Sequence, residues 1–251
     1  MKSLFVMLPC YNEEKDITPL LQKWLEISKS ILEYGYQLKI YCIDDKSTDS
    51  TNAIIKSFTG KNPDSVNIIE HEINKGLGGA LFTALVAFNN NAKTGDICVI
   101  MDGDNTHDPK YVFDMINGIN NGYDCVIASR YCKTSHTKGV PPLRIFLSDG
   151  ARYFYSFVLG IKGVKDYTCG YRAYTFSIIN SAVEKYGKNL VERRSFACMM
   201  ELLYKLSLID AKFLEIPFEL NYSNKQGQSK LQLLKTIKES ILTAIKLRLS
   251  N

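Results

Sequence analysis

The sequence predicts an α/β fold in which a mostly parallel sheet carries helices on both faces. Three apolar, strand-like runs each stop at a polar, acid-rich loop, at 4–8, 38–43 and 96–101. Segments with helical spacing of apolar residues alternate with these runs. Such alternation is typical of parallel sheets, in which ligands bind beyond the carboxyl ends of the strands. We therefore expect the three loops to meet in space.

The individual elements follow from local patterns in chain order. Apolar residues at helical spacing between Ile17 and Ile31 predict the first helix, and a Ser/Thr/Asp cluster opens a second at 49–58. Further strands are expected at 66–70 and 125–129, and further helices at 77–89 and 109–120. Beyond Arg144 the pattern shifts to longer helical and less regular segments.

Composition indicates a folded protein of a reducing compartment. The 251 residues, 45% of them hydrophobic, fit one large domain. Seven scattered cysteines form no C-x-x-C pair, and no run reaches the roughly 20 apolar residues of a membrane-spanning helix. The N-terminus lacks a signal-peptide pattern, so a cytoplasmic location is expected. The net charge of +5 is spread among acids, which argues against a nucleic-acid partner.

Asp102 and Asp104 follow the third apolar run and are separated by Gly103. Two carboxylates at this spacing can converge on one hard cation, and Mg²⁺ or Mn²⁺ held by one or two carboxylates together with phosphates is common. A solvated Asp-Gly-Asp turn is the alternative. Asp102 and Asp104 are therefore the candidate metal ligands.

Six motifs in order resemble those of family 2 glycosyltransferases with the GT-A fold. Within that family the chain is similar to the branch of dolichol-phosphate mannosyltransferases and polyprenyl-phosphate glycosyltransferases. The motifs lie at 9–14, 44–49, 74–80, 102–104, 128–131 and 166–174, and the match reaches about Leu231. The resemblance implies a GT-A domain at 1–231, with a nucleotide-sugar half at 1–131 and an acceptor half at 132–231. A basic amphipathic helix is expected at 232–251.

The resemblance also assigns roles to residues. The catalytic residues would be Asp104, Asp166 and Arg130. The nucleotide-sugar contacts would be Pro9, Tyr11, Glu13, Ile43, Asp45, Asp102, Gly103, Arg130, Arg172 and Lys230. A cation on Asp102 and Asp104 would assist departure of the nucleoside diphosphate. Turn and cap chemistry remains the alternative for the loop at 44–49, where Asp49 or Ser47 would cap the next helix.

Two motifs have a structural interpretation beside the functional one. The glycines of the segment 74–80 favour close packing of a helix on the sheet over a phosphate cradle, because the Lys-Ser/Thr ending of a P-loop is missing. His107 is either a metal ligand or a solvated loop histidine.

The acceptor decides what Asp166 does. A sugar hydroxyl needs a general base, for which Asp166 is suited, whereas a lipid phosphate is already anionic and needs only to be positioned. In the second case Asp166 would orient Arg172 or the loop backbone. The family pattern has an arginine where this chain has Asn224, next to Lys225, and a glutamine where it has Thr106.

We therefore predict an inverting, metal-dependent glycosyltransferase that uses a GDP- or UDP-sugar, of mannose or glucose type, and a polyprenyl or dolichyl phosphate. The alternative acceptor is a hydroxyl of a lipid-linked or cell-surface glycan, with Asp166 as base. A non-catalytic nucleotide-sugar binding protein is a third hypothesis. The absence of G-x-G-x-x-G after the first strand disfavours a nicotinamide dehydrogenase.

Two segments have the pattern of surface helices that touch a membrane. Aromatic and aliphatic residues crowd 145–161, and 231–249 places Leu234, Ile237, Ile241, Ile245 and Leu249 near one face with lysines and Arg248 elsewhere. A basic amphipathic helix can lie in the interface of an anionic bilayer. The alternative is that both helices cover the core. Peripheral attachment to the inner face of the membrane is expected.

Overall fold

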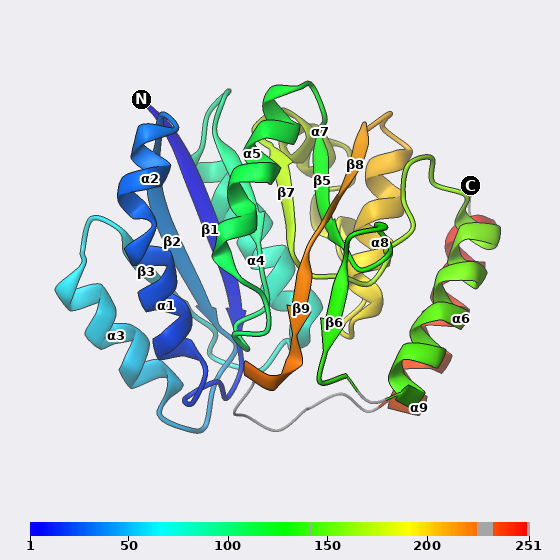
Figure 1. Ribbon diagram of the computed structural model, residues 1–251, viewed down its shortest axis with the longest axis horizontal. Helices are drawn as coiled ribbons and strands as arrows, with labels where there is room; N and C mark the ends of the chain where they lie inside the picture. Colours follow the sequence, from blue (N-terminus) through cyan, green and yellow to red (C-terminus); the bar gives the residue numbers. More distant parts are fainter. Residues whose placement is uncertain (141, 225–232, 250–251) are drawn as a thin grey trace.

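The computed structural model describes residues 1–140, 142–224 and 233–249. Its main sheet has seven strands in the order β3-β2-β1-β4-β7-β5-β8 (Figure 1). These are β1 (Lys2–Cys10), β2 (Tyr36–Asp44), β3 (Val66–Glu70), β4 (Ile97–Ile100), β5 (Cys125–Ser129), β7 (Arg172–Thr175) and β8 (Phe213–Pro217). Neighbours are parallel except that β7 is antiparallel to β4 and β5. The predicted α/β fold with a mostly parallel sheet is confirmed.

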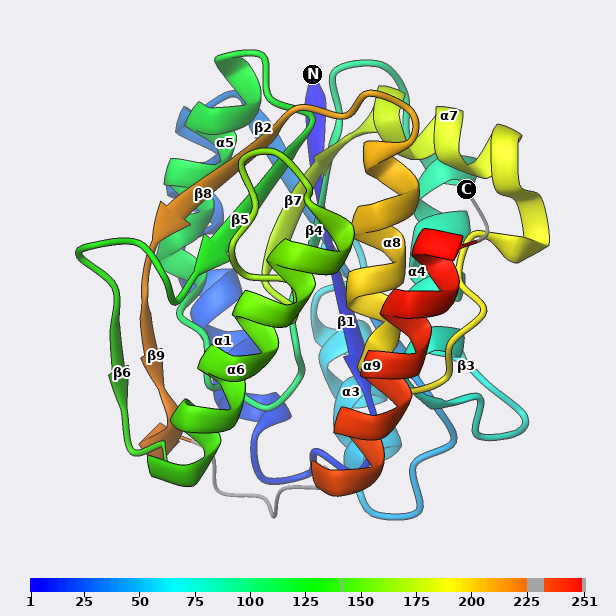
Figure 2. The same cartoon turned by 90° about the vertical axis from the view of Figure 1, so that its right-hand side faces the viewer.

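Helices cover both faces of the sheet, as predicted. Figure 2 shows α1 (Ile17–Glu26) and α5 (Val112–Asn120) on one face, and α4 (Gly76–Asn91), α7 (Phe176–Tyr186) and α8 (Ala197–Ser207) on the other. The remaining short elements are α2 (Ser28–Glu33), α3 (Thr51–Lys61), the 3₁₀ turns η1 (Pro109–Tyr111), η2 (Gly187–Asn189) and η3 (Tyr222–Asn224), and a two-stranded sheet of β6 (His136–Lys138) and β9 (Glu219–Asn221).

The core lies on both sides of β1. Every residue of this strand after Lys2 is buried, because helices pack on both of its faces. Phe5 contacts Phe88 of α4 edge-to-face, with ring centroids 5.3 Å apart, and stacks on Tyr41 of β2 at 5.8 Å. This packing holds the end of β1, and with it the first predicted loop, in a fixed place.

The structure refines several predicted elements. The helix predicted between Ile17 and Ile31 is two helices, which meet at Ile27. The next helix begins at Thr51 rather than at Asp49, because the Asp49 carboxylate accepts a hydrogen bond from the Thr51 N–H at 2.9 Å and so precedes the helix. Strand β7 was not predicted, since its four residues carry no alternating pattern and include Arg172.

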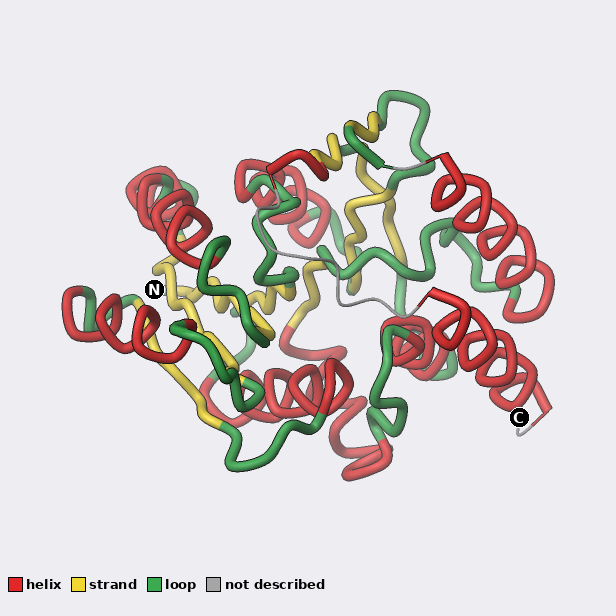
Figure 3. Tube along the Cα trace, turned by 90° about the horizontal axis from the view of Figure 1, so that it is seen from below, coloured by secondary structure: helices red, strands yellow, loops and turns green. Residues whose placement is uncertain are grey.

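One sheet spans the predicted division at residue 131, because β7 lies between β4 and β5. The division into nucleotide-sugar and acceptor halves therefore stays a functional prediction. On the flank beyond β8, α6 (Pro142–Leu159) packs against α9 (Leu233–Leu249), as Figures 2 and 3 show. No helix in the described ranges is both long enough and apolar enough to cross a membrane.

Candidate active site

The loops after β1 and β2 are fastened to each other. The two strands pair in register up to Cys10 and Asp44, so their loops leave the sheet side by side. The Asn12 side chain accepts a hydrogen bond from the Thr48 N–H at 2.7 Å, and the Asn12 N–H donates to the Ser47 hydroxyl at 3.0 Å. The two loops thus form one rigid edge.

The loop after β4 joins them. The Met101 N–H donates to the Met7 carbonyl at 3.2 Å, which continues the sheet to the start of this loop. A Cβ added to Gly103 would lie 3.1 Å from the Pro9 carbonyl oxygen and 3.2 Å from Cys10 Sγ. A glycine at this position therefore lets the acid pair approach the first loop closely. The predicted meeting of the three loops is confirmed.

Backbone strain is concentrated in the same loops. Of the four non-glycine residues with positive φ in the described ranges, three are Asn12, Lys46 and Asn105, one in each loop. Their φ angles are 54°, 62° and 56°. Asn105 is also held by Lys23 of α1, whose ammonium donates to its side-chain oxygen at 2.8 Å. Strained residues gather at functional sites, so this observation supports a ligand site at this edge.

Asp102 and Asp104 stand half-buried at the carboxyl end of β4. A Cβ at Gly170 would lie 2.7 Å from Asp102 Oδ1, so the loop at 166–171 presses its backbone against this carboxylate. Thr106 donates to Asp104 Oδ1 from its hydroxyl at 2.7 Å and from its N–H at 3.2 Å. Local sequence alone gives no sign of the contact with Gly170.

The donor chemistry of this pair fits a hard divalent cation that shares its ligands with a substrate. Within the described part of the chain no group of three or more His, Cys, Asp or Glu residues could hold a metal ion. Mg²⁺ commonly keeps only one or two carboxylates and takes its other ligands from phosphates and water. The pair therefore suits a cation that arrives with a diphosphate.

His107 matches neither of its two predicted interpretations. The side chain is buried, stacked on Phe218 with ring centroids 5.5 Å apart and edge-on to Tyr171 at 5.6 Å. Its Nε2 lies 3.8 Å from Cys169 Sγ. Burial raises the pKa of this thiol to about 12, so Cys169 is a neutral partner. His107 therefore links the loop after β4 to the loop at 166–171.

Asp45 is engaged within the protein rather than open to a ligand. Its Oδ1 contacts His71 Nδ1 at 2.7 Å and accepts the Lys75 N–H at 2.8 Å, while Oδ2 accepts the Gly76 N–H at 2.8 Å. The residue is 3% exposed. It holds the start of α4 in place, and its predicted contact with a nucleotide stays a prediction that requires this network to open.

The glycine motif packs as favoured, but against a different partner. A Cβ at Gly78 would lie 1.7 Å from the Arg193 carbonyl oxygen, and one at Gly76 would lie 2.7 Å from that of Arg194. The Arg194 side chain donates to the Asn74 carbonyl at 2.7 Å. The glycines thus admit the segment 193–194, not the sheet, and Gly78 N–H already donates to the Arg194 carbonyl at 3.1 Å.

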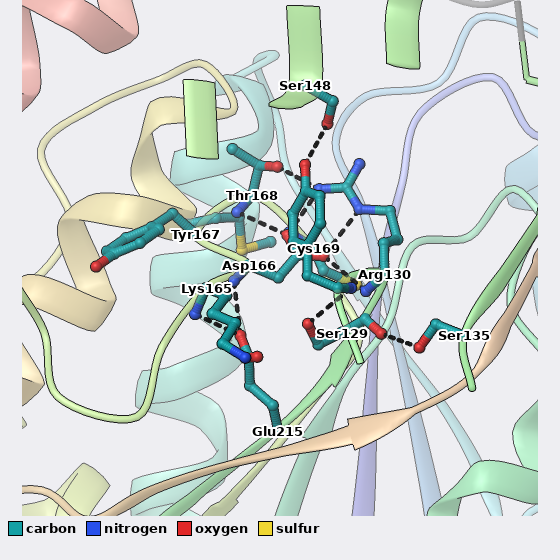
Figure 4. A network of polar contacts seen from close by, with 12 residues as sticks. Ser129, Arg130, Ser135, Ser148, Lys165, Asp166, Tyr167, Thr168, Cys169 and Glu215 are labelled. Carbon is teal, nitrogen blue, oxygen red and sulfur yellow. Dashed lines mark hydrogen bonds and ion pairs between the residues drawn. The ribbon is translucent and has the colours of Figure 1, made fainter. Parts of the chain in front are cut away.

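Arg130 and Asp166 form a two-pronged ion pair (Figure 4). Arg130 Nε donates to Asp166 Oδ2 at 2.8 Å and Nη2 donates to Oδ1 at 2.7 Å, and the Arg130 N–H adds a third bond at 3.0 Å. The Cys169 N–H donates to Oδ1 at 3.0 Å. The carboxylate is fully buried, whereas 22% of the Arg130 side chain is exposed. Arg130 therefore keeps one edge toward solvent in a fixed orientation.

These contacts disfavour Asp166 as a general base, and that role stays a prediction. Burial by itself raises the pKa of this carboxyl, but the charge and hydrogen bonds of Arg130 outweigh burial and bring the pKa below its usual value. A buried carboxylate with a low pKa and four or more donors takes up a proton poorly. Asp166 instead positions Arg130 and the loop backbone, and the partner it orients is not Arg172.

Arg172 was predicted to contact phosphate, but in the structure its side chain is engaged within the protein, so this contact stays a prediction that requires its bonds to open. Its side chain is fully buried and donates to the Met199 carbonyl at 2.7 Å and the Tyr167 carbonyl at 2.9 Å. The residue belongs to β7, paired with Ile100 on one side and Ile127 on the other. A position in the centre of the sheet directs this guanidinium into the α8 layer, where it bonds to the Met199 carbonyl.

The other predicted nucleotide-sugar contacts differ in how exposed their side chains are. The Ile43 side chain is fully buried in the core, and Pro9, its partner across β1 and β2, is buried too. Tyr11 is 37% exposed and Glu13 is half-buried, its N–H donating to the Thr51 hydroxyl at 2.7 Å. Lys230 lies outside the described residues, and its role stays a prediction.

Comparison with known proteins identifies the family. Residues 5–185 match the model of glycosyl transferase family 2. Polyprenol monophosphomannose synthase of Mycolicibacterium smegmatis is 26% identical over 89% of this chain and 81% of its own. Dolichol-phosphate mannosyltransferase of Pyrococcus furiosus is 29% identical over 90% of this chain and 58% of its own. This chain thus spans a little over half of the Pyrococcus protein.

Solved structures agree on the fold. Glucosyl-3-phosphoglycerate synthase of Mycobacterium tuberculosis, in complex with Mn²⁺ and UDP-glucose, superposes with a TM-score of 0.67 at 17% identity. The superposition covers 98% of this chain and 79% of that protein. The same enzyme has been solved with Mg²⁺ and UDP. The sheet and helix layers described above are therefore those of a known glycosyltransferase fold.

Proposed function

Because this chain belongs to glycosyl transferase family 2, we propose that this glycosyltransferase moves one sugar from a GDP- or UDP-sugar to a polyprenyl or dolichyl phosphate, with inversion. The sugar is of the mannose or glucose type, in line with similarity to mannose-transferring relatives and to a dolichyl-phosphate β-glucosyltransferase of Dictyostelium discoideum. Donor and acceptor then meet at the loop edge of the sheet.

The state of Asp166 carries the choice of acceptor. A sugar hydroxyl must lose a proton as it attacks, so its transferase needs a base within reach. Asp166, the predicted base, is buried and committed to Arg130. A phosphate oxygen is already anionic and needs no base, only orientation and charge compensation. The geometry therefore favours a lipid phosphate over a glycan hydroxyl.

On the donor side, Asp102 and Asp104 would hold Mg²⁺ or Mn²⁺ together with the diphosphate. The cation, when bound, stabilises the charge that develops on the departing nucleoside diphosphate. Thr106 fixes one oxygen of Asp104, and Gly170 leaves room for Asp102, so both carboxylates are oriented before a ligand binds. Such preorganisation lowers the reorganisation that accompanies bond breaking.

The flank formed by α6 and α9 supports attachment to a membrane surface. α9 turns small or polar residues inward, Ser240, Thr243 and Ala244, and leaves large apolar ones exposed, Ile241, Leu242, Ile245 and Leu249. On α6, Phe157 is 91% exposed and Tyr153 is 66% exposed. This is the reverse of a helix that only covers the core. With exposed Lys238 and Lys246 nearby, the surface suits the interface of an anionic bilayer at the inner face of the membrane.

The test is transfer of radiolabel from GDP-mannose and, separately, UDP-glucose into organic-extractable polyprenyl phosphate. The reactions contain Mn²⁺ or EDTA, and Asp104→Asn serves as the blank. Label in the lipid phase that depends on metal would support the proposal and identify the donor. Metal-dependent nucleotide binding without lipid label would overturn the proposed acceptor.

A further inference from the structure

Asn105, the residue that follows Asp104, is the centre of a strained turn. Asp104 Oδ1 accepts the Thr106 N–H at 3.2 Å and the Thr106 hydroxyl at 2.7 Å, which closes the turn across Asn105. Asn105 itself has a φ of 56°, in the left-handed region, and is 5% exposed. Asparagine tolerates this conformation better than most residues, but the surroundings must still hold it there. The orientation of Asp104 therefore depends on what holds Asn105.

Lys23 of α1 makes the contact that holds Asn105. The Lys23 ammonium donates to Asn105 Oδ1 at 2.8 Å, between residues that lie 82 positions apart in the sequence. Within the ranges that the structure describes, Lys23 forms no ion pair, so its charge strengthens this hydrogen bond. α1 is a rigid support for the lysine, because one face of the helix is fully buried in the core through Ile17, Leu20, Leu21 and Trp24.

Loss of the Lys23 contact would release the turn. The buried Asn105 side-chain oxygen would lack its donor, and a buried acceptor without a donor is costly. Rotation of Asn105 to an ordinary negative φ would relieve the backbone strain, and it would carry the Thr106 N–H and hydroxyl away from Asp104 Oδ1. The Thr106 carbonyl accepts the Asn221 N–H at 3.2 Å, but this bond fixes Thr106 and not Asn105. Lys23 therefore stabilises the conformation in which Asp104 is oriented.

We propose that Lys23 is a positioning residue for the divalent cation, because it holds Asn105 in the left-handed conformation and so fixes the direction of the Asp104 carboxylate. This inference rests on the proposed function, in which Asp104 holds Mg²⁺ or Mn²⁺ together with the donor diphosphate. A positioning role and a simple effect of charge have opposite signs. Removal of a positive charge beside a cation site favours the cation by Coulomb's law, whereas loss of ligand orientation disfavours it.

Calorimetric titration of GDP and of UDP, each in Mn²⁺ and in EDTA, tests this assignment. The gain in nucleotide affinity that Mn²⁺ provides, here called the Mn²⁺ gain, measures the cation site without turnover. Lys23→Met keeps the apolar stem and loses the ammonium. We expect the Mn²⁺ gain of this variant to fall by about tenfold, because a contact that orients a metal ligand is lost. Affinity in EDTA should stay within about twofold, whereas general loosening of the fold would lower both affinities.

Two further variants show whether Lys23 acts through Asn105. Asn105→Gly needs no support, since glycine adopts a positive φ without strain, so adding Lys23→Met to it should change the Mn²⁺ gain by no more than about twofold. A further loss as large as in wild type would overturn the assignment. Lys29→Met is the matched control, because Lys29 is exposed on α2 and forms no ion pair among the described residues. Lys29→Met should keep the Mn²⁺ gain of wild type, and an equal fall there would overturn the assignment.

The outcomes separate this inference from the proposed function. A Mn²⁺ gain that is unchanged or larger in Lys23→Met overturns the positioning role, even where wild type transfers sugar to polyprenyl phosphate. A wild type that makes no lipid-linked sugar overturns the proposed acceptor, whereas a Mn²⁺ gain that depends on Lys23 would still support the positioning role. A wild type without a Mn²⁺ gain for either nucleotide overturns both the metal assignment and this inference.

Discussion

The loop edge of the sheet and the flank of α6 and α9 are built in opposite ways. At the loop edge, polar side chains bond to one another and to the backbone, as Asn12 does with the Thr48 N–H and Asp45 with His71 and the Gly76 N–H. On the flank, large apolar side chains face outward. A polar edge stiffened by hydrogen bonds holds a polar ligand in one geometry, whereas an exposed apolar surface requires a separate apolar phase to cover it.

The difference suggests that the two regions bind different parts of the substrates. The edge that would hold a nucleotide and a cation is stiffened by strained, hydrogen-bonded loops. The flank that would meet a lipid is held to the body by packing of α9 against α8. The ion pair of Arg130 and Asp166 joins the loop after β5 to the loop at 166–171, which follows α6 in the chain. Substitutions at the loop edge should therefore change sugar transfer or stability, whereas substitutions on the flank should change binding to lipid.

Asp104→Asn should give the largest effect. Removing one carboxylate from the proposed cation site should lower the rate of sugar transfer by about 10²- to 10³-fold, because a group that stabilises developing charge is lost. The measurement is the transfer rate at saturating Mn²⁺. Asp108→Asn is the matched control, since the side chain of that half-buried residue caps η1 and pairs with Lys110. Equal rates for wild type and Asp104→Asn would contradict the metal assignment.

Asp166→Asn should mainly affect folding. It leaves the Arg130 guanidinium without its carboxylate, which should lower the free energy of unfolding by about 3 kcal/mol. Because the folded pKa lies below the usual value, the pair stabilises wild type above about pH 4 and loses this contribution as pH falls through the folded pKa. Urea unfolding should therefore show a difference in the free energy of unfolding between wild type and Asp166→Asn that is smaller in acid than at pH 7. If Asp166→Asn is as stable as wild type, and the pH dependence of its kcat lacks the ionisation of a general base that wild type shows, the hydroxyl acceptor is favoured instead.

Gly78→Ala should destabilise the protein where the start of α4 packs against the segment 193–194. The added methyl would meet the Arg193 carbonyl oxygen at 1.7 Å, so the segment 193–194 must shift, at a cost of about 2 kcal/mol. Gly60→Ala in α3 is the matched control, because nothing lies within 4 Å of its Cβ. That change should stabilise by about 0.5–1 kcal/mol. Thermal unfolding of both variants measures the difference, and equal effects would exclude the close contact.

Phe157→Ala should give the smallest effect on the protein and a visible one on membranes. The ring is 91% exposed, so stability should not change, but its transfer into lipid is lost and binding to anionic vesicles should fall by about tenfold. Vesicle sedimentation measures this. Leu32→Ala should leave vesicle binding unchanged, because Leu32 is 51% exposed but belongs to α2, which lies on the opposite flank in Figure 1. A comparable loss for Leu32→Ala would argue against a defined membrane face.

The sequence by itself determined the layered fold and the place of the site. Apolar runs ending at 8, 43 and 101 predicted three strands, and the parallel order of those strands brings their ends to one edge. The acid pair and the close packing at the glycines of 74–80 could also be predicted, because adjacent residues carry that chemistry. The segment that packs against these glycines could not be predicted. The sequence also predicted the apolar pattern of α9, but it did not decide whether that face packs on the core or faces outward.

Only the tertiary structure decided what each charged residue does. Asp45, Asp166 and Arg172 all lie in motifs that read as ligand contacts, yet all three are buried and bonded to the protein. Their partners are 31, 36 and 27 residues away in sequence, so no local pattern encodes the pairing. The outward turn of Ile241 and Ile245 has the same origin, since packing of α9 against α6 and α8 selects the face that remains exposed.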